Sequence, residues 1–192
     1  MPGVSGAARP VPPRPGPHWP SQRIAEILRV DHSGELAAVA IYRGQRAVMA
    51  AAPGGSAAAA DFARLEAEEQ VHLARFERLI LEARTRPSLL APLWRAAGFA
   101  LGAATALIGE TAAHACTEAV ESVIEGHYAA QIAELEEAAP KLAAELARFR
   151  SEESDHRREA EAKGAREAPG GGVMRALIRA GCRAAIRIAE KV

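Results

Sequence analysis

The sequence predicts an all-α protein with a four-helix bundle at its centre. Apolar residues make up 49% of the chain but aromatic residues only 4%, and the apolar set is mostly Ala, Leu, Val and Ile. Ala and Leu favour helices. Apolar side chains also recur at alternating spacings of three and four along four segments, which is typical of the buried face of a bundle helix. Pro and Gly separate these segments.

Bulk properties exclude several classes of protein. The formal net charge is zero, so we expect no nucleic-acid partner. Cys116 and Cys182 form no Cys-x-x-Cys pair, which argues against a disulfide framework and fits a reducing compartment. Residues 1–20 lack a signal-peptide stretch and hold seven prolines and three glycines. We expect a disordered Pro-rich tail over residues 1–20 and one domain over residues 21–192.

The first two helices are expected to form a hairpin. The first spans residues 21–51, with Ser21 as its N-cap, and the Pro-Gly-Gly run at 53–55 ends it. The second spans residues 56–84 and stops before Pro87, because the residue before a proline disfavours helical backbone.

The next segment, residues 89–109, is unusually apolar. It is about long enough to span a bilayer core, but it contains Pro92, Arg95 and three glycines. Three interpretations follow: a spanning helix, a buried connecting helix, and an interfacial helix with Trp94 and Arg95 at the level of the lipid headgroups.

Three further helices complete the prediction. One covers residues 107–138, and the next covers residues 140–163, with a proline in its first turn where proline is tolerated. The Pro-Gly-Gly-Gly run at 169–172 is a break. The last helix, residues 173–191, carries basic side chains at a four-residue spacing: Arg175, Arg179, Arg183 and Arg187.

Acidic and imidazole side chains interrupt the apolar faces of the four bundle helices. Two helices carry Glu-x-x-His at mid-face, and each preceding helix carries one glutamate there. The six residues are Glu35, Glu69, His72, Glu121, Glu153 and His156. Buried carboxylates need a partner, a proton or a metal, and these faces hold no matching Lys or Arg. The pattern matches the ferritin-like di-iron carboxylate proteins.

The strength of this pattern lies in position, since a lone Glu-x-x-His arises readily by chance. Each half of the chain has the order Glu, loop, Glu-x-x-His, which indicates two helical hairpins that each supply half of the site. The alternative is a structural bundle with surface Glu/His pairs.

Other polar residues have plainer interpretations. Asp31 lies one turn before Glu35 and is expected to accept the free N–H of a metal-bound histidine, or to be an ordinary helix acid. His32 and His127 fit either packing or hydrogen bonding around the metals. Six glutamates are expected on solvated faces: Glu66, Glu68, Glu134, Glu136, Glu137 and Glu152.

Several stretches carry a family resemblance: RVDHSGELAAVAIYRGQ (29–45), EEQVHL (68–73), PLWRAAGFALGAATALIG (92–109), ACTEAVESVIEGHYAAQI (115–132), FRSEESDH (149–156) and AGCRAAIRIAEKV (180–192). They closely resemble the demethoxyubiquinone hydroxylases of ubiquinone biosynthesis. The resemblance covers the chain from residue 21 onward. Ser33, Val39-Ala40 and Ser122 depart from residues common in the family, but none removes a ligand.

The resemblance implies a ferritin-like fold with a di-iron centre. Its two iron ions are expected on the six residues named above, with Glu69 and Glu153 as bridges. The implied reaction is a monooxygenation that uses O2 to hydroxylate the ring of a polyprenyl demethoxyubiquinol. His127 and Tyr128 match a family pair with a suggested role in electron or proton transfer.

The resemblance also bears on partners and location. A lipid-soluble quinol favours the interfacial interpretation of residues 89–109 and a peripheral position on the cytoplasmic face of the cell membrane. NADH is the expected electron donor. A lipid-presenting protein partner and a homo-oligomer both fit, and the C-terminal arginines suit a partner or anionic lipid. The rivals are a ferritin- or rubrerythrin-like iron or peroxide-handling protein, a hydroxylase for a non-lipid substrate, and a non-enzymatic helical module.

Overall fold

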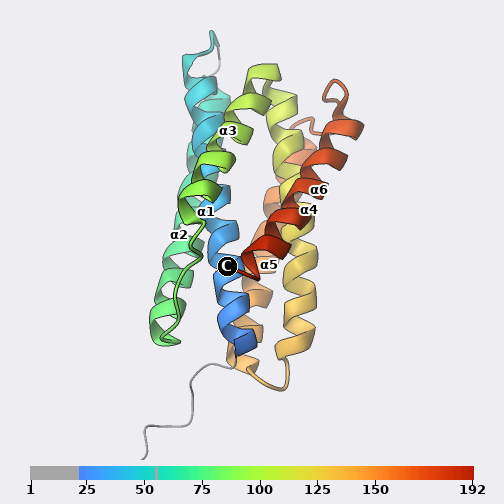
Figure 1. The fold of residues 1–192 in the computed structure, drawn as a ribbon. Helices are drawn as coiled ribbons and strands as arrows, with labels where there is room; N and C mark the ends of the chain where they lie inside the picture. Colours follow the sequence, from blue (N-terminus) through green and yellow to red (C-terminus); the bar gives the residue numbers. More distant parts are fainter. Residues whose placement is uncertain (1–21, 55) are drawn as a thin grey trace, which may run out of the picture.

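The computed structural model describes residues 22–54 and 56–192, and these residues form six α-helices (Figure 1). The helices are α1 (Gln22–Ala51), α2 (Ser56–Glu82), α3 (Ala91–Ile108), α4 (Glu110–Leu135), α5 (Pro140–Ala162) and α6 (Gly171–Ala189). The all-α prediction is therefore confirmed. The predicted tail over 1–20 and the predicted N-cap Ser21 lie outside the described residues.

Glycine and proline set the helix boundaries as the sequence predicts. Gly109 has a φ of 144°, which a side chain would strain, and it separates α3 from α4. Pro140 lies in the first turn of α5. Gly170, with a φ of 63°, precedes α6. Of the predicted break at 169–172, only residues 169–170 are non-helical, because α6 already begins at Gly171.

The bundle consists of α1, α2, α4 and α5, with α3 and α6 on its outside (Figure 1). α1 packs most extensively against α2 and α3, and α4 packs against α5 and α6. The two predicted hairpins are therefore α1–α2 and α4–α5. The end of α6 returns to the start of α3, where the Leu89 N–H donates to the Val192 carbonyl oxygen at 3.5 Å. This is a ferritin-like four-helix bundle with two added helices.

Two apolar clusters form the core of the bundle, one toward each end. The first includes Leu28, Phe76, Leu146 and Phe149, from the start of α1, the end of α2 and the start of α5. The second, from the end of α1 and the starts of α2 and α4, includes Ala38, Tyr42, Met49, Phe62 and Ala113. A polar layer lies between them.

Helix α3 lies directly on α1. A Cβ on Gly102 would be 2.0 Å from the Ile41 carbonyl oxygen, and one on Gly44 would be 2.4 Å from that of Phe99. α3 is long and apolar enough to cross a membrane by length and composition, but only 22% of it is buried. The buried-connector interpretation is therefore wrong, because the glycine side of α3 is covered while its outer side is not.

Candidate metal centre

The six predicted residues meet in the polar layer of the bundle, and all are buried. α1 supplies Glu35, α4 supplies Glu121, and α2 and α5 each supply a Glu-x-x-His pair. Four of them offer ligand atoms that lie within 4.8 Å of one another: Glu35, Glu69, His72 and Glu153. The alternative of surface Glu/His pairs is wrong, because no member of the six is more than 6% exposed.

The Nδ1 atoms of both histidines point at the motif glutamates. His72 Nδ1 lies 3.5 Å from Glu69 Oε2 and 3.0 Å from Glu153 Oε1. His156 Nδ1 lies 3.0 Å from Glu69 Oε1 and 3.2 Å from Glu153 Oε2. Each of the two glutamates thus offers one oxygen to each histidine. Glu35 lies on the His72 side, with its Oε2 3.6 Å from Nδ1.

The pKa values of this layer reflect an excess of carboxylates over imidazoles. Burial, together with the neighbouring carboxylates, raises the pKa of Glu35 and of Glu121 well above the ordinary value. Burial would also raise the pKa of Glu69, but contacts with both histidines outweigh it and lower that pKa to about 2. Burial alone would lower the pKa of His156, yet Glu153 and Glu69 raise it to about 11. Four carboxylates therefore compete for two imidazoles.

Several buried atoms of the layer have no hydrogen-bond partner among the described residues. They are Glu69 Oε1, His72 Nδ1, Glu121 Oε2 and Glu153 Oε1. Three of these atoms make the ion-pair contacts given above without the geometry of a hydrogen bond, and no ion pair involves Glu121 Oε2. Burying polar atoms without hydrogen bonds is costly. Carboxylate oxygens with imidazole nitrogens are suited to divalent iron or manganese. The donor set therefore fits a buried metal centre.

Both tyrosines of the sequence hold outer glutamates of the layer. The Tyr42 hydroxyl of α1 donates to Glu121 Oε1 of α4 at 2.7 Å, and the Tyr128 hydroxyl of α4 donates to Glu35 Oε1 of α1. Burial raises the pKa of each phenol well above 10, so both remain proton donors. The role of Tyr42 was missed from the sequence. Its signal was available, since each tyrosine follows the glutamate of its own helix by seven residues.

The outer nitrogens of the two histidines contact carboxylates that the sequence did not link to the site. His72 Nε2 lies 2.5 Å from Glu152 Oε2, and His156 Nε2 lies 3.0 Å from Glu68 Oε2. The side chains of Glu68 and Glu152 are partly solvated as predicted, but their contacts with the histidines were missed. Asp31 was predicted either to accept a histidine N–H or to be an ordinary helix acid. Asp31 is instead buried and accepts a hydrogen bond from Gln131 Nε2 at 2.8 Å. Helix spacing alone does not show which helix lies opposite.

Other polar residues also find defined places. Glu66, expected to be solvated, is 5% exposed because Arg43 and Arg46 each place Nε 2.8 Å from its carboxylate. Glu134, Glu136 and Glu137 are exposed as predicted. His127 Nε2 lies 2.9 Å from Gln131 Nε2 and 3.6 Å from Asp31 Oδ1. It therefore contacts the Asp31–Gln131 pair rather than the six residues.

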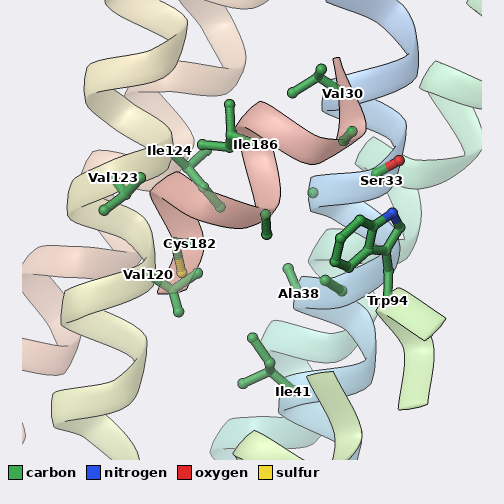
Figure 2. A pocket seen from close by; sticks show the side chains of 14 residues that line it. Val30, Ser33, Ala38, Ile41, Trp94, Val120, Val123, Ile124, Cys182 and Ile186 are labelled. Atoms are coloured by element: carbon green, nitrogen blue, oxygen red, sulfur yellow. The ribbon is translucent and has the colours of Figure 1, made fainter. Parts of the chain in front are cut away.

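An apolar cavity of about 90 Å³ lies beside the layer (Figure 2). Its walls include Ala38 of α1, and Val120 and Ile124 of α4, which are close neighbours of Glu35 and Glu121 in their helices. Trp94 of α3 and residues of α6 such as Ile186 line it on the outside. The cavity therefore lies between α1 and α4, which carry Glu35 and Glu121, and the outer helices α3 and α6.

Comparisons with known proteins agree with this geometry. A family model described as ubiquinone biosynthesis protein COQ7 matches residues 22–189. A 3-demethoxyubiquinol 3-hydroxylase of Rhodospirillum rubrum is 47% identical over 178 residues, which cover 93% of this chain and 82% of the relative. A mitochondrial NADPH-dependent 3-demethoxyubiquinone 3-hydroxylase of Homo sapiens is 41% identical over 88% of this chain and 78% of its own. A Caenorhabditis elegans protein of the same description is 37% identical over 92% of this chain and 96% of the relative. The chain therefore belongs to the COQ7 family of ubiquinone biosynthesis proteins, as its motifs predict.

Proposed function

We propose that this chain is a 3-demethoxyubiquinol 3-hydroxylase, a monooxygenase that adds one hydroxyl from O2 to the quinol ring. The observation that carries the proposal is the buried layer of four carboxylates and two imidazoles in a chain of this family. A ferritin- or rubrerythrin-like role is not favoured, because relatives that match most of the chain are named hydroxylases.

The proposed cofactor is a pair of iron ions. Glu35 and His72 would hold one ion, and Glu121 and His156 the other, with Glu69 and Glu153 as bridges. The bridging assignment is supported by the two oxygens that each of these glutamates offers to the two histidines. When bound, the iron pair supplies the activation of O2. The nearby clusters of Phe76, Phe149, Phe62 and other apolar side chains cover the two ends of the layer.

The chain's own residues would orient the metals and the substrate. Tyr42 and Tyr128 hold one oxygen of Glu121 and of Glu35, which leaves the second oxygen of each free for a metal. The quinol ring would enter the apolar cavity beside these glutamates. His127, one residue before Tyr128, remains a candidate for proton or electron transfer through Asp31 and Gln131.

The prenyl tail would leave the cavity between α3 and α6, which lie on the same side of the bundle (Figure 1). Both helices expose apolar side chains: Leu93, Phe99, Leu107 and Ile108 on α3, and Val173 and Leu177 on α6. This supports a peripheral position in which both helices rest in the membrane interface. We propose that the protein lies on the cytoplasmic face of a cell membrane. The human and mouse relatives, in contrast, are named mitochondrial.

The reaction also needs two electrons and two protons to reduce the second oxygen atom of O2 to water. The human and mouse relatives are named NADPH-dependent. We therefore propose a reduced nicotinamide nucleotide as the donor for this chain, with NADH as the one predicted. A lipid-presenting partner or a second copy of the chain remains a proposal.

Complementation tests the proposal. A strain that accumulates demethoxyubiquinone should regain ubiquinone when it expresses the wild-type chain, and should not regain it with Glu69→Ala. Glu145→Ala is the matched control, because Glu145 pairs with Arg75 across the same two helices, 2.5 Å apart, outside the polar layer. A folded, iron-loaded wild type that leaves demethoxyubiquinone unchanged would show that the substrate is wrong.

A further inference from the structure

The two Glu-x-x-His helices share a longer repeat than the ligands require. In α2 and in α5 the same residue types occur at the same spacing, Arg-x-x-x-Glu-Glu-x-x-His. The members are Arg64, Glu68, Glu69 and His72 in α2, and Arg148, Glu152, Glu153 and His156 in α5. The second glutamate and the histidine are the proposed ligands. The arginine and the first glutamate have no role in the function proposed so far.

The first glutamate of each repeat contacts the histidine of the other helix. Glu68 of α2 lies 3.0 Å from His156 Nε2, and Glu152 of α5 lies 2.5 Å from His72 Nε2. Each carboxylate is also held by an arginine of its own helix, one turn earlier. Arg64 Nη1 lies 2.9 and 3.0 Å from the Glu68 oxygens.

The second half repeats this contact. Arg148 Nη1 lies 2.9 Å from Glu152 Oε1. Each chain of contacts thus runs from an arginine, through a carboxylate on the same helix, to a histidine on the opposite helix. The Tyr42–Glu121 and Tyr128–Glu35 bonds cross between the two halves in the same way.

The chemistry of imidazole explains why the contact is needed. A metal takes the lone pair of Nδ1, so the ring proton must sit on Nε2, and this N–H needs an acceptor. His72 and His156 are almost fully buried, whereas the side chains of Glu68 and Glu152 are 42% and 38% exposed. The two carboxylates and the two histidines line a polar hollow of about 420 Å³ between α2 and α5.

We infer that Glu68 and Glu152 are positioning residues of the metal centre: each accepts the Nε2–H of the opposite histidine and thereby aims its Nδ1 at the metal. Arg64 and Arg148 hold the two carboxylates in place. The inference rests on the proposed ligation by His72 and His156. Outer carboxylates of this kind fix both the tautomer and the ring orientation of a metal-bound histidine.

A purely structural role, tying α2 to α5, makes a different prediction. Other ion pairs join these helices without touching a histidine, among them Arg75 with Glu145 and Arg64 with Glu159, each at 2.5 Å. Glu145→Ala therefore removes a cross-helix ion pair of the same kind and serves as the control for Glu68→Ala and Glu152→Ala.

The experiment measures Fe(II) affinity by anaerobic competition with a coloured chelator, together with thermal unfolding of the metal-free protein. Glu68→Ala and Glu152→Ala should each weaken iron binding by about 10- to 100-fold. Glu68→Gln and Glu152→Gln keep an acceptor oxygen and should recover most of that affinity. Glu145→Ala should bind iron like wild type. Unchanged affinity in both alanine variants, or an equal loss in Glu145→Ala, would overturn the inference.

The crossed pairing gives a second test. With His72→Ala as background, half of the centre remains on His156, and adding Glu68→Ala should weaken this remaining binding. With His156→Ala as background, Glu68 has no histidine to hold, and adding Glu68→Ala should change little. Equal losses in the two backgrounds would contradict the crossed assignment. Failure of the wild type itself to bind iron would instead refute the proposed metal centre.

Discussion

The contact between α3 and α1 leads to a quantitative prediction for Gly102→Ala. The new Cβ would lie 2.0 Å from the Ile41 carbonyl oxygen, whereas ordinary contact begins at 3.4 Å, so the two backbones must separate locally by about 1.4 Å. Such overpacking costs about 1–3 kcal/mol. Alanine also favours the helix over glycine by about 1 kcal/mol, which offsets part of this cost. Gly126→Ala in α4 isolates the second effect, because nothing lies within 4 Å of its Cβ position.

We therefore expect Gly102→Ala to have a free energy of unfolding about 1–3 kcal/mol lower than that of Gly126→Ala, measured by urea denaturation of the metal-free proteins. Trp94 lies two turns earlier on α3 and lines the cavity, so the KM for quinol should rise in Gly102→Ala while the iron content stays at the wild-type level. Equal stability of the two variants would show that α3 does not rest on α1 through these glycines.

Three further predictions concern single side chains. Tyr42→Phe removes the donor to buried Glu121 and should lower the free energy of unfolding of the metal-free protein by about 1–3 kcal/mol in urea, and an unchanged value would contradict the bond. Burial, helped by Lys163, lowers the pKa of His114 from 6.5 to about 4. The His114 imidazole therefore binds a proton more readily in the unfolded chain than in the folded one. Between pH 6.5 and 4 the free energy of unfolding of the wild type should fall by about 3 kcal/mol more than that of His114→Met, and parallel pH curves for the two proteins would refute this. Leu107→Ser on the exposed face of α3 should weaken partition onto phospholipid vesicles about 10- to 150-fold, because a leucine buried in lipid contributes about 1.5–3 kcal/mol, and equal flotation of both proteins would count against the membrane face.

The helices and the six candidate ligands could be predicted because both depend on spacing within a single helix. Glu69 and His72 share the apolar face that carries Phe62 and Phe76, so their burial follows from the sequence alone. The residue types at that depth then indicate a metal, since buried carboxylates need a cation.

What the sequence did not predict depends on contacts between helices. The side chain of Glu68 is partly exposed, yet its carboxylate contacts His156 of α5. The pattern of residues along α2 cannot reveal this contact. Glu66 is buried because two arginines of α1 cover it. The sequence also could not predict how much of α3 is exposed, because Gly98 and Gly102 fit both a fully buried helix and a helix covered on one side. The structure shows that these glycines contact the backbone of α1.

The central claim is that this centre transfers an oxygen atom from O2 to a quinol ring. The most direct measurement is mass spectrometry of the product formed by the iron-loaded protein from a short-chain demethoxyubiquinol, a chemical reductant and ¹⁸O2. We expect a hydroxylated quinol that carries one ¹⁸O atom, and no such product from Glu69→Ala. Iron-loaded wild type that consumes ¹⁸O2 but leaves the quinol ring unlabelled would contradict it.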